Sequence, residues 1–269
     1  MLIDINAYVG HWPFQQFRYN TCEKLLDRMN KFGVEVSVIS NMNGIFYKNT
    51  QSANEELYDE IKSNKRFSDR FIPFAVINPT YAGWRDDFEI CITKMGMKGI
   101  RVYPKYHDYE ITDPSLIELV KLARDRGLPV AFNLRMVDSR TTSWMDIPYI
   151  YESSKPEWEL KDIAPIVREV PDAKYIILNV SMFNFEVSDE AKELLKKADV
   201  VFDTSGRAIK PLGELLKTYG KDKFAFGTHS PILDYLTGLL RIESLRANEA
   251  DEATKELLRS GNAKRILGI

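Results

Sequence analysis

The sequence contains few cysteines, and this scarcity narrows the chemistry that the chain can perform. Only Cys22 and Cys91 occur among 269 residues, and neither belongs to a Cys-x-x-Cys pair. That spacing is typical of structural zinc sites, so a zinc site of that type is excluded. Both cysteines fall in segments predicted as helices, and we expect buried free thiols that behave as small apolar side chains.

Long apolar runs and a strong excess of charge are also missing. No stretch of about 18 apolar residues occurs, so we expect no membrane span. The first residues, MLIDINAYVG, lack the basic region of a signal peptide. The net charge of −2 gives no reason to expect a nucleic-acid partner. We therefore expect a cytoplasmic enzyme or binding protein that acts on a small molecule.

Short apolar runs alternate with helical patterns along the whole chain. Strands are predicted at 2–9, 34–40, 71–77, 99–103, 129–134, 174–180, 200–204 and 223–227. Each run is followed by a helical pattern, and eight such pairs predict an α/β protein with a single (β/α)8 TIM barrel over residues 1–269. Two more helical patterns, Asp251–Arg259 and Asn262–Leu267, predict a C-terminal helical extension.

A doubly wound open sheet is the alternative fold. Such a sheet usually carries a glycine-rich phosphate loop after its first strand, whereas the turn here reads Ala-Tyr-Val-Gly-His-Trp-Pro. The barrel is therefore favoured. The connection 135–158 is long, polar and aromatic, and we expect it to be an insertion that forms a lid or a partner surface. Its aromatic-rich part, 144–158, is equally consistent with a contact in a homo-oligomer.

Polar side chains collect where the predicted strands end. The carboxyl ends of barrel strands surround one pocket, and residues two apart on a strand share a face. The candidates are Asn6, Tyr8, Arg101, Tyr103, Lys105, Asn133, Arg135, Asn179 and Asp203, together with the three histidines His11, His107 and His229. Because a buried amide needs hydrogen-bond partners, asparagines inside apolar strands predict a polar pocket.

Other interpretations of these residues stay open. Each histidine alone is more often a surface or packing residue. The asparagines are also consistent with a neutral hydrogen-bond network. Arg101 and Arg135 are suited to clamp a carboxylate or phosphate in bidentate fashion. Ion pairs with Asp108, Asp138 or Glu110 would explain the two arginines equally well.

Four segments of the chain are similar to the amidohydrolase superfamily, in the branch called amidohydrolase family 2, which includes decarboxylases and lactonases. They are Ile-Asp-Ile-Asn-Ala-Tyr-Val-Gly at 3–10, Gly-Ile-Arg-Val-Tyr-Pro at 99–104, Phe-Gly-Thr-His-Ser-Pro at 226–231 and Gly-Asn-Ala-Lys-Arg-Ile-Leu-Gly at 261–268. This resemblance implies a TIM-barrel hydrolase or lyase. Members usually bind a divalent metal through an Asp-x-His-x-His motif, histidines ending strands five and six, and an aspartate ending strand eight.

The expected metal ligands are replaced in this chain. The positions that correspond to them are Asn6, Tyr8, Asn133, Asn179 and His229. Neutral amides and a phenol are poor ligands compared with imidazole and carboxylate. We therefore expect no metal at that position and no other cofactor. The alternative is a rearranged zinc site built from His11, His107 and His229, because three histidines suffice for catalytic zinc.

Three functions compete. The first is a hydrolase or lyase without the usual metal site, in which His229 is the general acid or base, Asp203 orients it, and Tyr8 or Tyr103 donates to an oxyanion. Its small, polar, anionic substrate would be bound by Asn6, His11, Arg101, Tyr103, Lys105, Asn133, Arg135 and Asn179. The second is a catalytically inactive homologue that binds a small ligand or a protein partner. The third uses Lys105 as a Schiff-base lysine, and its polar neighbours disfavour that function.

Overall fold

Parallel strands form the centre of the molecule, with helices packed around them. The computed structural model describes residues 1–13, 15–134, 136, 158–180, 185–205 and 212–269. The strands are β1 (Ile3–Val9), β2 (Val36–Asn41), β3 (Phe71–Pro73), β4 (Ala75–Val76), β5 (Ile100–Val102), β6 (Pro129–Asn133), β7 (Lys174–Leu178), β8 (Asp199–Asp203) and β9 (Phe224–Ala225). The strands pair in the orders β1-β2-β3 and β4-β5-β6-β7-β8-β9, and all of these pairs are parallel.

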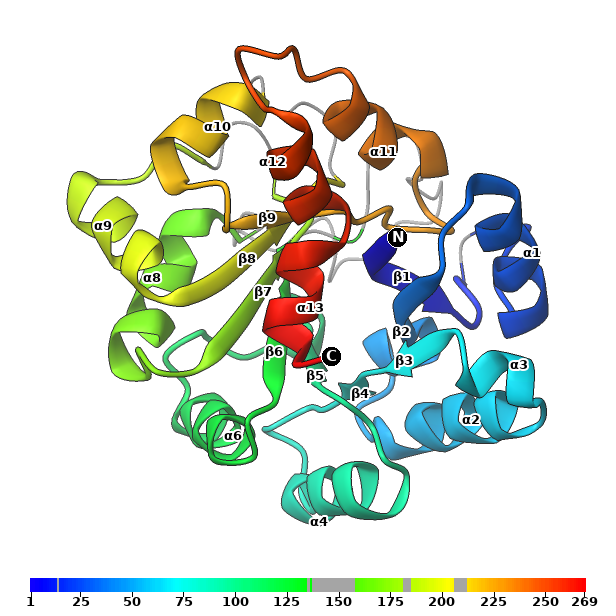
Figure 1. Cartoon of the computed structure of the whole chain (residues 1–269). Helices are drawn as coiled ribbons and strands as arrows, with labels where there is room; N and C mark the ends of the chain where they lie inside the picture. Colours follow the sequence, from blue (N-terminus) through cyan, green and yellow to red (C-terminus); the bar gives the residue numbers. More distant parts are fainter. Residues whose placement is uncertain (14, 135, 137–157, 181–184, 206–211) are drawn as a thin grey trace.

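Helices follow the strands and surround them as an outer layer (Figure 1). They are α1 (Cys22–Phe32), η1 (Met42–Ile45), α2 (Gln51–Lys62), α3 (Lys65–Ser68), α4 (Trp84–Glu89), η2 (Ile90–Lys94), α5 (Pro104–His107), α6 (Pro114–Asp125), α8 (Leu160–Glu169), α9 (Asp189–Lys197), α10 (Leu212–Tyr219), α11 (Tyr235–Glu243), α12 (Glu252–Glu256), η4 (Leu257–Gly261) and α13 (Asn262–Leu267). In the ranges described, no helix is long and apolar enough to cross a membrane.

The predicted TIM barrel is confirmed, with one predicted strand divided in two. β3 pairs with β2 and β4 pairs with β5, because the Phe74 N–H donates to Ile39 of β2 and the Ala75 N–H donates to Gly99 on the other side. β3 and β4 therefore occupy one position of the barrel. Backbone hydrogen bonds from Ile5 to Phe226 (2.9 Å) and from Tyr8 to Ser230 (2.8 Å) join β1 to the chain around β9.

The interior of the barrel is apolar toward the amino ends of the strands. A buried cluster contains Ile3, Ile5, Val38, Phe74, Ala131, Ile176, Leu178, Val201 and Ala225. Ala263 and Ile266 of α13 belong to the same cluster, so α13 covers this end of the barrel, as Figure 1 shows. The polar strand residues must therefore lie toward the opposite, carboxyl end.

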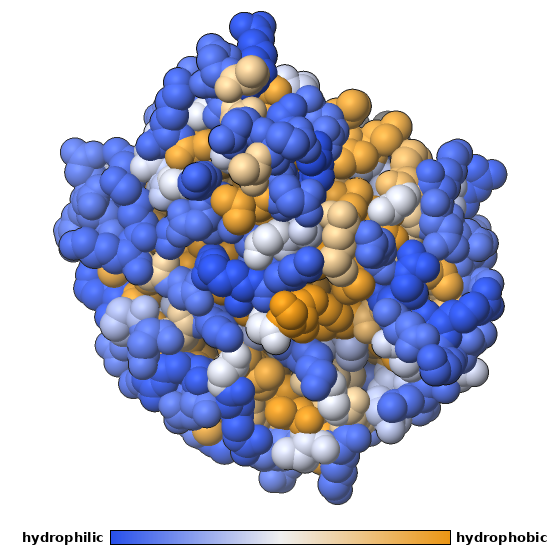
Figure 2. Space-filling model, viewed as in Figure 1, coloured by the Kyte–Doolittle hydropathy of each residue, from blue (hydrophilic) through white to orange (hydrophobic). Residues whose placement is uncertain are grey.

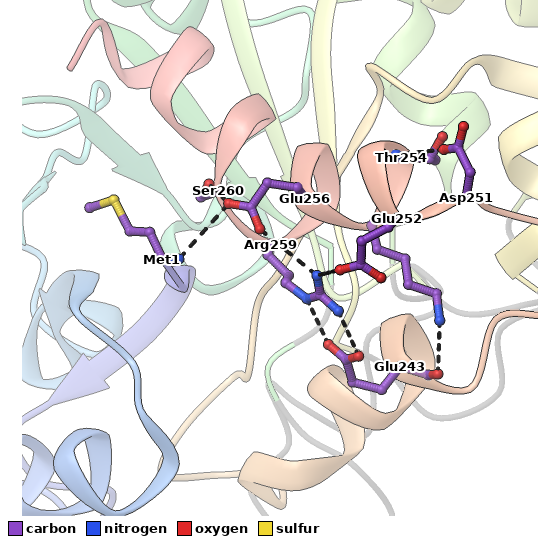
Figure 3. Close-up of polar contacts among 9 residues, drawn as sticks. Met1, Glu243, Asp251, Glu252, Thr254, Glu256, Arg259 and Ser260 are labelled. Carbon is purple, nitrogen blue, oxygen red and sulfur yellow. Dashed lines mark hydrogen bonds and ion pairs between the residues drawn. The ribbon is translucent and has the colours of Figure 1, made fainter.

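The C-terminal helical extension is anchored by an ion cluster outside the barrel (Figure 3). Arg259 donates from Nε and Nη2 to the two carboxylate oxygens of Glu243, at 2.8 and 2.7 Å, and its Nη1 donates to Glu252. This fork joins η4 to α11. Glu243 is 39% exposed, so we assign the pair only a modest stabilising role, since such pairs typically contribute about 1 kcal/mol or less.

Candidate functional site

Seven polar side chains, from five strands and the residues that follow them, meet at the carboxyl end of the barrel. Asn6 and Tyr8 belong to β1, and Asn133 ends β6. The others follow their strands: Asn179 after β7, Asp203 and Ser205 at the end of β8, and His229 after β9. All of these side chains are buried. The structure thus brings together residues that are far apart in the sequence, as the strand-end pattern predicts.

The Asn6 amide is the hub of this cluster. Its Nδ2 lies 2.6 Å from Asp203 Oδ2, 3.1 Å from His229 Nδ1 and 3.3 Å from Ser205 Oγ. Asp203 also accepts hydrogen bonds from the Asn179 backbone N–H at 2.8 Å and from the Ser205 hydroxyl. Asp203 is therefore joined to His229 through the Asn6 amide.

These contacts fix the proton on the imidazole. Because Asn6 donates to the Asp203 carboxylate, the same amide nitrogen faces His229 Nδ1, which must then be the acceptor. The ring proton is left on Nε2, which lies 3.2 Å from the carbonyl oxygen of Met136. The Asn179 amide nitrogen lies 3.5 Å from the same ring nitrogen. His229 is therefore assigned as a neutral imidazole that donates from Nε2.

Burial makes the Asp203 carboxylate harder to ionise. Desolvation raises the pKa of Asp203 above its ordinary value, while the hydrogen bonds from Ser205, Asn6 and Asn179 and the charge of Arg241 oppose that rise. Gly227 allows this close packing. A Cβ at Gly227 would lie 2.7 Å from Asp203 Cβ and 2.9 Å from Asp203 Oδ2, so only glycine fits there without a shift of its neighbours.

Tyr8 packs beside Asn133 and His229 at the edge of the cluster. Its ring meets the His229 ring edge-on at 5.2 Å, and its hydroxyl donates to Asn133 Oδ1 at 3.0 Å. The Arg101 guanidinium carbon lies 4.4 Å over the Tyr8 ring, a cation–π contact. Burial raises the pKa of Tyr8 far above its ordinary value, so its hydroxyl stays a donor at neutral pH.

Arg101 is fully buried and has unused hydrogen-bonding capacity. Its Nη1 donates to the Ala7 carbonyl at 3.2 Å, whereas Nε and Nη2 make no hydrogen bond with the described residues. Within the described ranges Arg101 also forms no ion pair, so the alternative pairing with Asp108 or Glu110 is not observed. Burial raises the pKa of Tyr103 to about 12, and the charge of Arg101 and its hydrogen bond with the Tyr103 hydroxyl oppose that rise.

The structure does not bring every predicted residue into the cluster. His11 is exposed, and its backbone N–H donates to Asn43 at 3.0 Å. His107 is buried in α5, where Nε2 contacts the Gly44 carbonyl at 2.9 Å and burial lowers its pKa to about 4. Lys105 is half-buried on the same helix. Arg135 and most of the 135–158 insertion lie outside the described residues.

Two groups in the cluster were not assigned from the sequence. Ser205 follows Asp203 by two positions, and the alternation of strand residues places both at the same strand end, but no role in the site was predicted for Ser205. The Met136 carbonyl belongs to the segment after β6, and a backbone atom in such a connection leaves no signal in the sequence. The Ser205 hydroxyl donates to Asp203, and the Met136 carbonyl lies opposite Nε2 of His229.

A cavity of about 500 Å³ lies at the opposite end of the barrel. Its lining includes Phe71, Leu128 and Leu267, next to the residues that precede β5 and β6. Hydrophobic residues also reach the surface on this face, near the carboxyl end of α13 (Figure 2). The cavity lacks converging titratable groups of the kind found around Asn6, so we do not assign the reaction to it.

Comparison with known proteins decides the family. The sequence matches the amidohydrolase family over residues 32–269. The chain belongs to that family. The predicted resemblance is therefore confirmed, and the match begins after β1, the strand that carries Asn6 and Tyr8. No curated protein matches the sequence.

Solved structures share the amidohydrolase fold at low sequence identity. A dihydroxybenzoic acid decarboxylase from Polaromonas matches with TM-score 0.73 and 13% identity, covering 99% of this chain and 96% of that chain. The 2,6-dihydroxybenzoate decarboxylase from Rhizobium matches with TM-score 0.71 and 14% identity, covering 99% and 98%. The 5-carboxyvanillate decarboxylase from Sphingomonas paucimobilis gives 0.70 and 14%, covering 100% and 99%. At these identities the matches establish the fold alone.

The expectation that no cofactor is involved is wrong. The Polaromonas decarboxylase, which has the same fold, was solved with manganese bound. The alternative zinc site of His11, His107 and His229 is also wrong, because no three His, Cys, Asp or Glu side chains gather into a metal group within the described part of the chain. The described residues do not match the donor set that a divalent ion prefers, so we derive no step through a metal.

Proposed function

We propose that this protein is a hydrolase or lyase that acts on a small, polar, anionic substrate at the carboxyl end of its barrel. The observation that carries the proposal is the buried cluster in which one amide, Asn6, joins the Asp203 carboxylate to the His229 imidazole. Buried acid and base groups at this end of a TIM barrel are typical of a reacting centre.

His229 is the proton donor in this proposal. In the assigned tautomer Nδ1 is occupied by Asn6, and the proton sits on Nε2 opposite the Met136 carbonyl. A substrate that displaces this carbonyl takes its place as the acceptor. In a hydrolysis the Nε2 proton moves to the leaving group, and the resulting imidazolate takes a proton from the attacking water. In a decarboxylation the Nε2 proton moves to the carbon that has lost CO2, and the imidazolate regains a proton from solvent water. Asp203, acting through the Asn6 amide, stabilises the orientation of the ring.

Arg101 is the group that favours an anionic substrate. Its two unused donors, Nε and Nη2, form one edge of the guanidinium, and that edge matches the two oxygens of a carboxylate. A buried guanidinium without an anion is energetically costly, so a bound carboxylate would compensate its charge. The Tyr103 hydroxyl lies beside the Arg101 guanidinium and would donate to the same group.

The remaining strand-end residues are proposed to orient the substrate. Asn133 and Asn179 offer amides beside Tyr8 and His229. His11, Lys105 and Arg135 stay predictions as substrate-binding residues, since no described contact links them to the cluster. The similar structures act on aromatic carboxylates, as their names state, so we choose 2,6-dihydroxybenzoate and 5-carboxyvanillate as probes.

The test is turnover of these two probes by the purified protein. Loss of probe absorbance and release of CO2 are followed with and without added manganese. We expect turnover, and we expect His229→Gln to lower it by at least about 100-fold, as is usual for the loss of a general acid. His107→Gln is the matched control, because His107 is a buried histidine outside the cluster, and it should keep turnover. Equal turnover by wild type and His229→Gln would contradict the proposal.

A ligand-binding protein without turnover is the second candidate. It is favoured by one observation, that both ring nitrogens of His229 already contact protein atoms, Asn6 Nδ2 and Met136 O. Isothermal titration with the same probes separates the candidates. Saturable binding together with absent turnover would support the second candidate and reject the first.

A further inference from the structure

His229 has a backbone conformation that requires support. Its φ is +55°, in the left-handed region that L-residues other than glycine and asparagine seldom adopt. Such a conformation persists only where the surroundings fix it, and it is often found at functional sites. One support is direct, because the His229 N–H donates to the carbonyl of Asn6 at 2.7 Å.

The second support comes from the carboxylate of Asp4, which is fully buried at the start of β1. Its Oδ1 accepts from the backbone N–H groups of Asn6 (2.9 Å) and Thr228 (3.0 Å), and its Oδ2 accepts from the Thr228 hydroxyl (2.6 Å). The Thr228 hydroxyl in turn accepts from the Ser230 N–H at 3.0 Å. One carboxylate thus connects both neighbours of His229 to the strand that carries Asn6.

We propose that Asp4 is a positioning residue of the His229 centre: through Thr228 it holds the His229 backbone in the left-handed conformation and the imidazole against the Asn6 amide. The catalytic meaning of this inference rests on the proposed function. The orientation of the ring can be measured without any substrate.

The hydrogen bonds of the Thr228 hydroxyl determine which variants test this inference. It donates to Asp4 Oδ2 at 2.6 Å, and the Asn6 carbonyl lies at 3.3 Å as a second acceptor. In Asp4→Asn the new amide would donate to the Thr228 hydroxyl, which would turn to the Asn6 carbonyl. That variant keeps the side-chain hydrogen bond between residue 4 and Thr228, with donor and acceptor exchanged. Thr228→Val removes the hydroxyl links at nearly constant volume, and Thr228→Ser keeps them.

Three other titratable groups interact with the Asp4 charge, and the Thr228 variants change none of them. The negative charge of Asp203 repels it, while the positive charge of Arg28 from α1 attracts it. The Tyr235 phenol of α11 lies within the range of the Asp4 charge. All three groups are unchanged in the Thr228 variants, so those variants report on the hydroxyl alone.

The experiment is nitrogen NMR of protein labelled with ¹⁵N-histidine, in which the His229 signals are identified by their loss in His229→Gln. Wild type should show the large Nδ1–Nε2 shift separation of a single Nε2–H tautomer. We expect Thr228→Val to reduce this separation toward that of a freely exchanging imidazole, Thr228→Ser to restore it, and Asp4→Asn to give an intermediate value. With an active probe, Thr228→Val should lower kcat roughly tenfold and leave KM nearly unchanged.

Unchanged His229 shifts in a folded Thr228→Val protein would overturn the inference. If that variant does not fold, Thr228→Ala decides in its place, because it also removes the hydroxyl links, and wild-type His229 shifts in a folded Thr228→Ala protein would overturn the inference equally. Failure of the proposed function gives a different result, in which no probe is turned over while the His229 shifts still respond to Thr228→Val and recover in Thr228→Ser.

Discussion

Replacing Asp4 with asparagine tests how burial and hydrogen bonding compete at one carboxylate. Burial raises the pKa of Asp4 from 3.8 to about 6, although Thr228 and Asn6 donate hydrogen bonds that favour the charged form. The folded protein therefore binds the Asp4 proton more tightly than the unfolded chain does. Between these two pKa values the folded state holds more protons, so this group's contribution to stability falls as the pH rises.

The size of this effect follows from the two pKa values. A difference of 6 minus 3.8 corresponds to about 3 kcal/mol in total, and about 2 kcal/mol of it falls between about pH 4.5 and pH 8. Urea unfolding of wild type and Asp4→Asn across this range measures it. The unfolding free energy of wild type minus that of the variant should decrease by about 2 kcal/mol toward pH 8. A difference that rises with pH would refute the reasoning, and a constant difference would show that Asp4 titrates normally.

Three other predictions concern buried residues. Burial lowers the pKa of His107 to about 4, so the stability of wild type relative to His107→Gln should fall by up to about 3 kcal/mol as the pH drops from 6.5 toward 4, measured by urea unfolding. Gly227→Ala places a Cβ 2.7 Å from Asp203 Cβ and should cost about 1–3 kcal/mol, with an unchanged melting temperature as the contrary result. Thr204→Val leaves the Gly227 N–H without its acceptor and should cost about 1–3 kcal/mol, whereas Thr204→Ser should stay near wild type.

Much of the fold could be predicted because its signals are local. Apolar runs bounded by helical patterns identified all the strand positions, and they differed from the structure mainly at the strand ends. The predicted strand 71–77 was divided because successive N–H groups, those of Phe74 and Ala75, bond to opposite neighbours. The buried free thiols of Cys22 and Cys91 are confirmed. Helix α5 was missed, because Pro104 begins a single turn within a segment that looks polar.

The site was predicted less completely than the fold. Strand alternation correctly grouped Asn6, Tyr8, Asn133, Asp203 and His229, since residues at the carboxyl ends converge in any barrel. Which of these side chains touch one another depends on how strands that are far apart in the sequence are placed in space. Local sequence patterns carry no information about that placement. The sequence therefore could not show that an amide separates Asp203 from His229. It also suggested a shared histidine site, and the burial of His107 against Gly44 rules that out.

Roles of partners and location remain predictions. They are a small-molecule substrate, the absence of a nucleic-acid or membrane partner, a cytoplasmic location and a homo-oligomer contact through 144–158. The lid role of 135–158 lies outside the described residues apart from Met136 and Trp158. Of these two, Met136 contributes its carbonyl oxygen to the His229 contact and its sulfur to Asn133.

A crystal structure of the protein soaked with 2,6-dihydroxybenzoate tests the central claim most directly. The account predicts that the probe binds at the carboxyl end of the barrel, with its carboxylate on the Nε–Nη2 edge of Arg101 and its ring beside His229. Probe density confined to the cavity near Phe71 and Leu267, with none beside His229, would contradict it.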